Sequence, residues 1–122
     1  MDTKFIRLED KESLDKLIEA LRLEELEADL RGSATTKSTY QDIDLNVWDT
    51  RKAYRGRREI IDGLLKTINA EEINFSPPAC NTTWITGKWR FKINKTEFDL
   101  IYTPWGPSLQ GYAKSEEKTP SN

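Results

Sequence analysis

The sequence predicts a single α/β domain, because segments with helical periodicity alternate with segments in which apolar residues recur at every second position. Helical patterns occur near residues 11–22 and 55–70, and strand patterns occur at 26–31, at 42–47 and in the last third of the chain. A chain of 122 residues is long enough to bury one hydrophobic core.

The first helix is expected from Lys11 to Arg22, with Asp10 as its N-cap. Its apolar residues recur at helical spacing and form one stripe: Leu14, Leu17, Ile18 and Leu21. A second helix is expected from about Arg55 to Ala70, although Gly63 weakens its middle. Its core positions are Ile60, Ile61, Leu64, Leu65 and Ile68.

Two strands are expected between these helices. The first covers Leu26 to Arg31 and runs into a turn at Gly32 and Ser33. The second has apolar Ile43, Leu45 and Val47 on one face and Asp42, Asp44 and Asn46 on the other. The two aspartates therefore point the same way.

The last third of the chain predicts a hairpin or meander. Apolar residues alternate before a turn at Asn94-Lys95, and a strand is expected from Phe98 to Thr103. We expect the domain to end near residue 109, with a polar, mobile tail at 110–122. Trp84, Trp89 and Trp105 could stack a base, but their pattern favours the core.

The composition limits the classes of function. A formal net charge of −2 disfavours binding to extended nucleic acid, and the absence of histidine excludes Ser-His-Asp, Cys-His and His-ligated zinc sites. A single cysteine and the lack of a long apolar run predict a cytoplasmic protein that does not enter a membrane. Carboxylates, hydroxyls and lysines are left to carry any chemistry.

One stretch combines residue types that suit phosphate and metal chemistry. Gly32 lets a backbone approach an anion closely, Ser33 offers a hydroxyl and backbone amides, and Lys37 adds positive charge nearby. Asp42 and Asp44 place two carboxylates side by side, where they repel unless a divalent cation lies between them. The pattern predicts a phosphate-binding turn beside a cation site.

Gly32-Ser33, then Asp42-x-Asp44, then Asp99 on a later strand resembles the signature of the DNA polymerase β-like nucleotidyltransferase superfamily, especially its minimal nucleotidyltransferases. The resemblance implies a small mixed sheet flanked by helices, a palm-like fold. It also implies two Mg²⁺ ions, or Mn²⁺, with Asp42 and Asp44 holding the triphosphate metal. Asp99 would share the second metal and help deprotonate the acceptor. Its strand would have to pair beside the strand of the first two aspartates.

The function implied by the resemblance is transfer of a nucleoside monophosphate from a nucleoside triphosphate, ATP in the first place, to a hydroxyl of a protein, a tRNA end or a small molecule. The small size resembles antitoxins that act with a separate helical toxin subunit, and a second copy of the chain is another partner to consider. The family's Arg-Gly pair in the spacer is replaced here by Thr36-Lys37. This replacement keeps an alternative open, a catalytically inactive module that binds a nucleotide or a protein.

Overall fold

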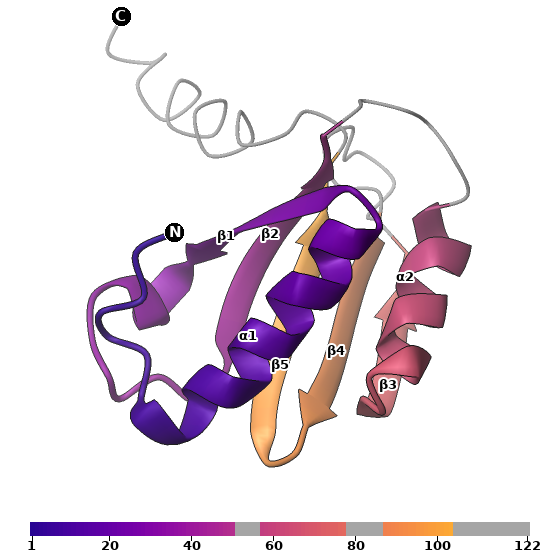
Figure 1. The fold of residues 1–122 in the computed structure, drawn as a ribbon. Helices are drawn as coiled ribbons and strands as arrows, with labels where there is room; N and C mark the ends of the chain where they lie inside the picture. Colours follow the sequence, from indigo (N-terminus) through magenta and orange to yellow (C-terminus); the bar gives the residue numbers. More distant parts are fainter. Residues whose placement is uncertain (51–56, 78–86, 104–122) are drawn as a thin grey trace, which may run out of the picture.

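The computed structural model describes residues 1–50, 57–77 and 87–103, and confirms the α/β class with two α-helices and a five-stranded mixed sheet (Figure 1). The elements in chain order are α1 (Leu8–Leu23), β1 (Leu26–Arg31), the 3₁₀ turn η1 (Gly32–Thr35), β2 (Ile43–Asp49), α2 (Arg57–Thr67), β3 (Glu71–Ser76), β4 (Gly87–Ile93) and β5 (Thr96–Tyr102). The expected tail at 110–122 lies outside the described residues, as do Trp84 and Trp105. No helix in the described ranges is both long and apolar enough to cross a membrane.

The sheet has the strand order β1-β2-β5-β4-β3. The central pair β2 and β5 is parallel, and the other neighbouring pairs are antiparallel. The expectation that the Asp99 strand lies beside the Asp44 strand is confirmed, since these two residues are direct partners in the β2–β5 register.

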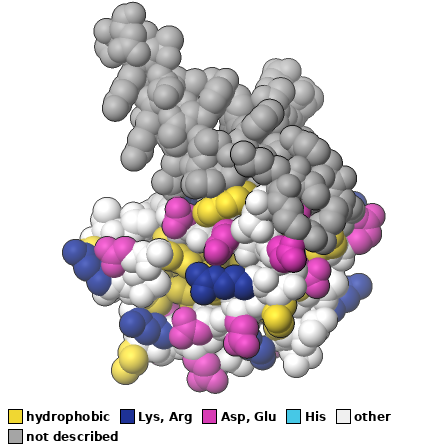
Figure 2. All heavy atoms as spheres, turned by 45° about the horizontal axis from the view of Figure 1, so that its top comes forward, with side chains coloured by type: hydrophobic (Ala, Val, Ile, Leu, Met, Phe, Trp, Pro, Cys, Tyr) yellow, Lys and Arg dark blue, Asp and Glu magenta, His cyan; other side chains and the backbone are white. Residues whose placement is uncertain are grey.

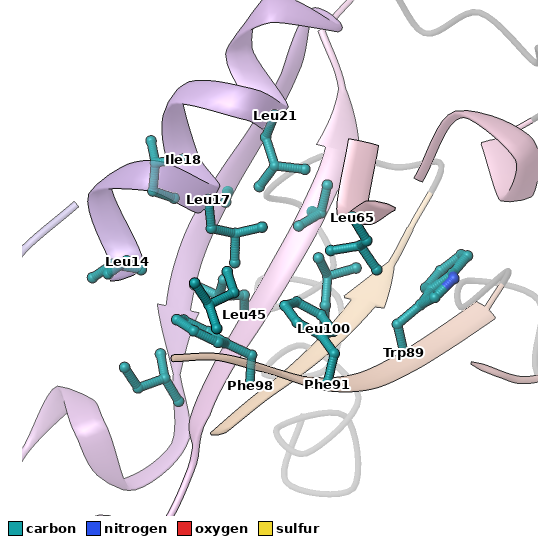
Figure 3. Close-up of a cluster of buried hydrophobic side chains, with 14 of the residues drawn as sticks. Leu14, Leu17, Ile18, Leu21, Leu45, Leu65, Trp89, Phe91, Phe98 and Leu100 are labelled. Carbon is teal, nitrogen blue, oxygen red and sulfur yellow. The ribbon is translucent and has the colours of Figure 1, made fainter. Parts of the chain in front are cut away.

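Both helices cover the same face of the sheet, with α1 crossing in front of β2 and β5 (Figure 1). The side chains of α1 and α2 meet alternate residues of the strands in one core (Figure 3). Labelled members of that core are Leu14, Leu17, Leu21, Leu45, Leu65, Phe91, Phe98 and Leu100. Trp89 is also buried here, and its indole N–H donates to Asp62 Oδ1 at 2.8 Å, so the core interpretation holds for this tryptophan.

The opposite face of the sheet carries polar residues, because strand side chains alternate between the two faces. In the described part of the chain, no helix lies over this helix-free face (Figure 1). One line of register partners crosses all five strands. It consists of Arg31, Asp44, Asp99, Arg90 and Asn74. The fold thus puts these polar side chains on one face of the sheet, where Asn46 and Asp99 are nevertheless buried.

The prediction of Asp10 as N-cap was wrong. Arg7 occupies the N-cap, and Asp10 lies inside the first turn of α1 with only 6% of its surface exposed. Its carboxylate accepts hydrogen bonds from Tyr40, Thr96 and Arg7 instead of capping the helix. A carboxylate in the first turn still interacts favourably with the helix dipole.

The sequence did not predict strand β3, and the second helix was predicted to extend to Ala70, which is too far. The helix ends at Thr67, and the chain reverses through Asn69, which has a φ of 61°. Four of the six residues of β3 are exposed, because β3 lies at the edge of the sheet. An edge strand buries too few apolar side chains to show a clear alternating pattern.

Replacing Gly63 with alanine is expected to stabilise the protein. Gly63 is exposed in the middle of α2, and a Cβ built there meets no atom within 4 Å. Alanine loses less backbone entropy on folding, so the free energy of unfolding should rise by about 0.5–1 kcal/mol. Urea denaturation of Gly63→Ala checks this, and a lower midpoint would contradict the exposed helical position.

The buried carboxylate of Asp10 should make stability depend on acid pH. Burial alone would raise the pKa of Asp10, but hydrogen bonds from Tyr40, Thr96 and Arg7 outweigh it and lower the pKa. A lowered native pKa stabilises the fold above the unfolded value of about 3.9, and this stabilisation is lost as the pH falls through the native pKa. Asp10→Asn should therefore cost about 2 kcal/mol at pH 7. Its deficit against the wild type should shrink between about pH 4 and pH 2 in urea titrations, and a constant deficit would contradict this account.

Candidate metal centre

Three carboxylates meet on the helix-free face. Asp44 and Asp99 lie opposite each other on the parallel strands β2 and β5, and Asp42 immediately precedes β2. One oxygen from each residue lies within 4.8 Å of the others, so the group could hold a metal ion. The sequence prediction that these three aspartates come together is thereby confirmed.

Two cationic side chains from β4 offset the negative charge of the cluster. Lys88 Nζ lies 3.3 Å from Asp99 Oδ2, and Arg90 Nη2 lies 3.3 Å from Asp42 Oδ2. The side chain of Asp99 is only 9% exposed, and its other oxygen, Oδ1, has no hydrogen-bond partner among the described residues. A buried carboxylate oxygen without a partner is costly, and a cation at the cluster could satisfy it.

The central carboxylate, Asp44, has a raised pKa. The main cause is burial, and the negative charges of Asp42 and Asp99 add to it. Arg31 and Lys88 act in the opposite direction without cancelling the effect. The ionised form of Asp44 is therefore disfavoured in the metal-free protein, and a bound cation would favour it.

The Gly-Ser turn packs directly against Asp44. Gly32 has a φ of 75°, and a Cβ added there would lie 2.5 Å from Asp44 Oδ2. Glycine is thus required both by the backbone conformation and by the approach of the carboxylate. The carbonyl of Ser33 accepts bonds from the N–H groups of Thr36 and Lys37, which close the turn.

Lys37 is exposed after this turn, and the described contacts do not place its ammonium group at the cluster. Its role in nucleotide binding stays a prediction, as does phosphate binding by Gly32 and Ser33. The geometry supports those two by placing their turn against Asp44.

Sequence reasoning missed the cations of this site, which are Arg31, Lys88 and Arg90. A signal was present, because Lys88 and Arg90 alternate with Trp89 and Phe91. If the aromatic residues face the core, the cations must share the face of Asp99 across the hairpin. The position of the partner strand was needed to use that signal.

A groove of about 320 Å³ begins at Asp42. Its other lining residues come from β3, β4 and β5: Glu72, Asn74, Arg90, Phe91, Lys92, Glu97 and Phe98. Acidic and basic side chains are interspersed on the surface visible in Figure 2, without a large patch of one sign. Of the three carboxylates of the cluster, Asp42 lines this groove, so the open space lies beside that residue.

Comparison of the chain with models of protein families finds no match. Comparison with curated proteins finds no match either. The three-carboxylate cluster and its surroundings therefore carry the functional argument.

Proposed function

We propose that the chain is a Mg²⁺-dependent nucleotidyltransferase with a DNA polymerase β-like palm fold, of the minimal type. The observation that carries the proposal is the cluster of Asp42, Asp44 and Asp99 beside the Gly32-Ser33 turn. Each of these residues fills its place in the signature described above. Their meeting at one site supports the proposal more strongly than their order in the chain does.

The donor set fits a hard divalent cation. Carboxylate oxygens are the ligands that Mg²⁺ and Mn²⁺ prefer, and Asp99 Oδ1 is buried without a partner among the described residues. Asp42, Asp44 and Asp99 would hold the metal. When bound, the metal would supply charge stabilisation for the triphosphate and for the attacking hydroxyl.

The chain's own residues have separate tasks in this proposal. The Gly32-Ser33 turn binds the phosphates of the triphosphate, and Asp99 accepts the proton of the acceptor hydroxyl. The hydroxyl oxygen forms a bond to the α-phosphorus while the bond to the leaving pyrophosphate breaks, so no covalent intermediate on the protein is needed. Lys88 and Arg90, which pair with Asp99 and Asp42, would supply positive charge to the phosphates of the triphosphate.

The donor proposed is a nucleoside triphosphate, ATP in the first place. The acceptor is a hydroxyl on a partner protein such as a small helical toxin, on a second copy of the chain, or on a tRNA end. The open groove beside Asp42 leaves room for an acceptor, which would have to be positioned largely by the partner's own surface.

A second candidate is an inactive module that binds a nucleotide or a protein. It is favoured by the ion pairs of Lys88 with Asp99 and of Arg90 with Asp42, because these cations neutralise the cluster without a metal. In that case, metal ions should have no effect on ligand binding.

The test is incubation of the purified chain with ATP labelled at the α-phosphate, with Mg²⁺, Mn²⁺ or EDTA. Candidate acceptors are the chain itself, bulk tRNA and any protein that co-purifies with the chain. Metal-dependent labelling of an acceptor with release of pyrophosphate supports the enzyme. Nucleotide binding that EDTA does not change, with no labelling, supports the inactive module.

A further inference from the structure

Of the three carboxylates, Asp42 alone lies outside a strand. Asp44 and Asp99 are fixed by backbone pairing on both sides, since β2 and β5 are interior strands. The first paired residue of β2 is Ile43, so the sheet does not hold the segment in front of it. Arg90 pairs with the Asp42 carboxylate, but through a side chain that is 60% exposed, so another contact must hold the backbone before Asp42.

Tyr40, two residues before Asp42, is anchored to the start of α1. It is 3% exposed, and its hydroxyl donates to Asp10 Oδ2 at 2.6 Å while accepting from the backbone N–H of Arg7 at 2.9 Å. The guanidinium of Arg7 donates to the carbonyl of Tyr40 at 3.2 Å and stacks 4.2 Å from its ring centre. Both the side chain and the backbone of Tyr40 are therefore held.

The carboxylate of Asp10, which accepts the hydrogen bond from Tyr40, also contacts β5. Thr96 Oγ1 donates to Asp10 Oδ1 at 2.7 Å, and Thr96 is the first residue of the strand that carries Asp99. Asp10 thus joins the segment before Asp42 to the strand of Asp99 through one buried group. We call Arg7, Asp10, Tyr40 and Thr96 the Asp10 network.

We propose that Tyr40 is a positioning residue for the metal centre, which holds Asp42 at its distance from Asp44 and Asp99 through the Asp10 network. The proposal rests on the proposed metal site. The two ends of the network should differ, because the backbone ladder holds Asp99 without Thr96, whereas no ladder holds Asp42. Loss of the Tyr40 hydroxyl therefore loosens a metal ligand, and loss of the Thr96 hydroxyl does not.

The experiment compares Tyr40→Phe with Thr96→Val, each of which removes one hydroxyl donor to Asp10 and keeps the shape of the side chain. Mn²⁺ alone is titrated into the full chain, with free Mn²⁺ followed by its electron paramagnetic resonance signal, and melting temperatures are measured in parallel. Both variants should melt at lower temperature than the wild type. Tyr40→Phe should weaken Mn²⁺ binding about tenfold, the scale of losses seen when partners of metal ligands are removed.

Thr96→Val should bind Mn²⁺ with the affinity of the wild type. If Tyr40 only stabilised the fold through Asp10, both hydroxyl variants would instead change Mn²⁺ affinity to the same extent. Arg7→Lys keeps the charge but cannot reproduce the planar stack on Tyr40, so it should weaken Mn²⁺ binding in the same direction and serves if Tyr40→Phe does not fold. Wild-type affinity in Tyr40→Phe, or equal losses in both hydroxyl variants, would overturn the positioning role while leaving the metal site in place. Absence of Mn²⁺ binding by the wild type would overturn the metal site and the positioning role together.

Discussion

Asp44→Asn is expected to abolish metal-dependent nucleotide transfer while making the metal-free protein more stable. Asp44 is the central carboxylate of the cluster, so asparagine replaces a charged ligand of the proposed metal with a neutral amide. Loss of a ligand should cost more than the roughly 10–100-fold effect of losing a ligand's partner, and activity should fall by more than about 100-fold.

The stability effect has the opposite sign because burial and the charges of Asp42 and Asp99 raise the pKa of Asp44. A raised native pKa means that the carboxyl stabilises the fold below its unfolded pKa, and that this stabilisation is lost as the pH rises through the native pKa. In EDTA, the variant should therefore melt above the wild type at pH 7, and the gap should close near pH 3.

Asp29→Asn is the matched control for Asp44→Asn. Asp29 lies on the same face of the sheet, on β1 opposite Asn46, and is not a member of the carboxylate cluster. This control should retain activity. Wild-type turnover in Asp44→Asn would show that the metal site has been placed wrongly.

Gly32→Ala should damage both the fold and the site. The φ of 75° is unfavourable for alanine, at a cost of about 1–3 kcal/mol, and the new Cβ would lie 2.5 Å from Asp44 Oδ2. The carboxylate must move away, so Mn²⁺ binding should weaken along with stability. Thermal denaturation and Mn²⁺ titration measure the two losses separately.

A double-mutant cycle with Asp44→Ala separates the two causes. When the carboxylate is absent, Gly32→Ala keeps the backbone strain but loses the collision, so its effect on stability should be smaller than in the wild type. Gly63→Ala makes the same chemical change in open space and should be stabilising. An equal cost of Gly32→Ala in both backgrounds would contradict the close approach of Gly32 and Asp44.

Much of this fold could be predicted from local sequence, since the apolar residues of α1, β1 and β2 form one stripe or one face each. β5 is buried on both faces, but its continuous apolar run still indicated a strand. The carboxylate cluster could also be predicted, because alternation fixes the face of each aspartate and one pairing of β2 with β5 brings the two faces together. These features depend on residues close in sequence and on a single long-range contact.

The parts that were missed depend on several long-range contacts at once. Asp10 resembles an N-cap locally, but its partners Tyr40 and Thr96 lie elsewhere in the chain. The pairing of Lys88 and Arg90 with the aspartates required the position of β4, which the alternating pattern alone does not give. Burial of a polar side chain is favourable only with its partners in place, so such residues cannot be recognised one at a time.

The neighbours β2 and β5 lie far apart in the chain, with α2, β3 and β4 between them. β1 and β2 are joined by a shorter connection, whereas the β2–β5 contact closes a long loop and forms at a higher entropic cost. Asp42 and Asp44 repel each other as soon as β2 forms, whereas the further repulsion from Asp99 arises only when β5 pairs with β2. During synthesis on the ribosome, the chain cannot offer all three carboxylates to a cation until β5 has emerged, so metal binding would report that β5 has joined the sheet.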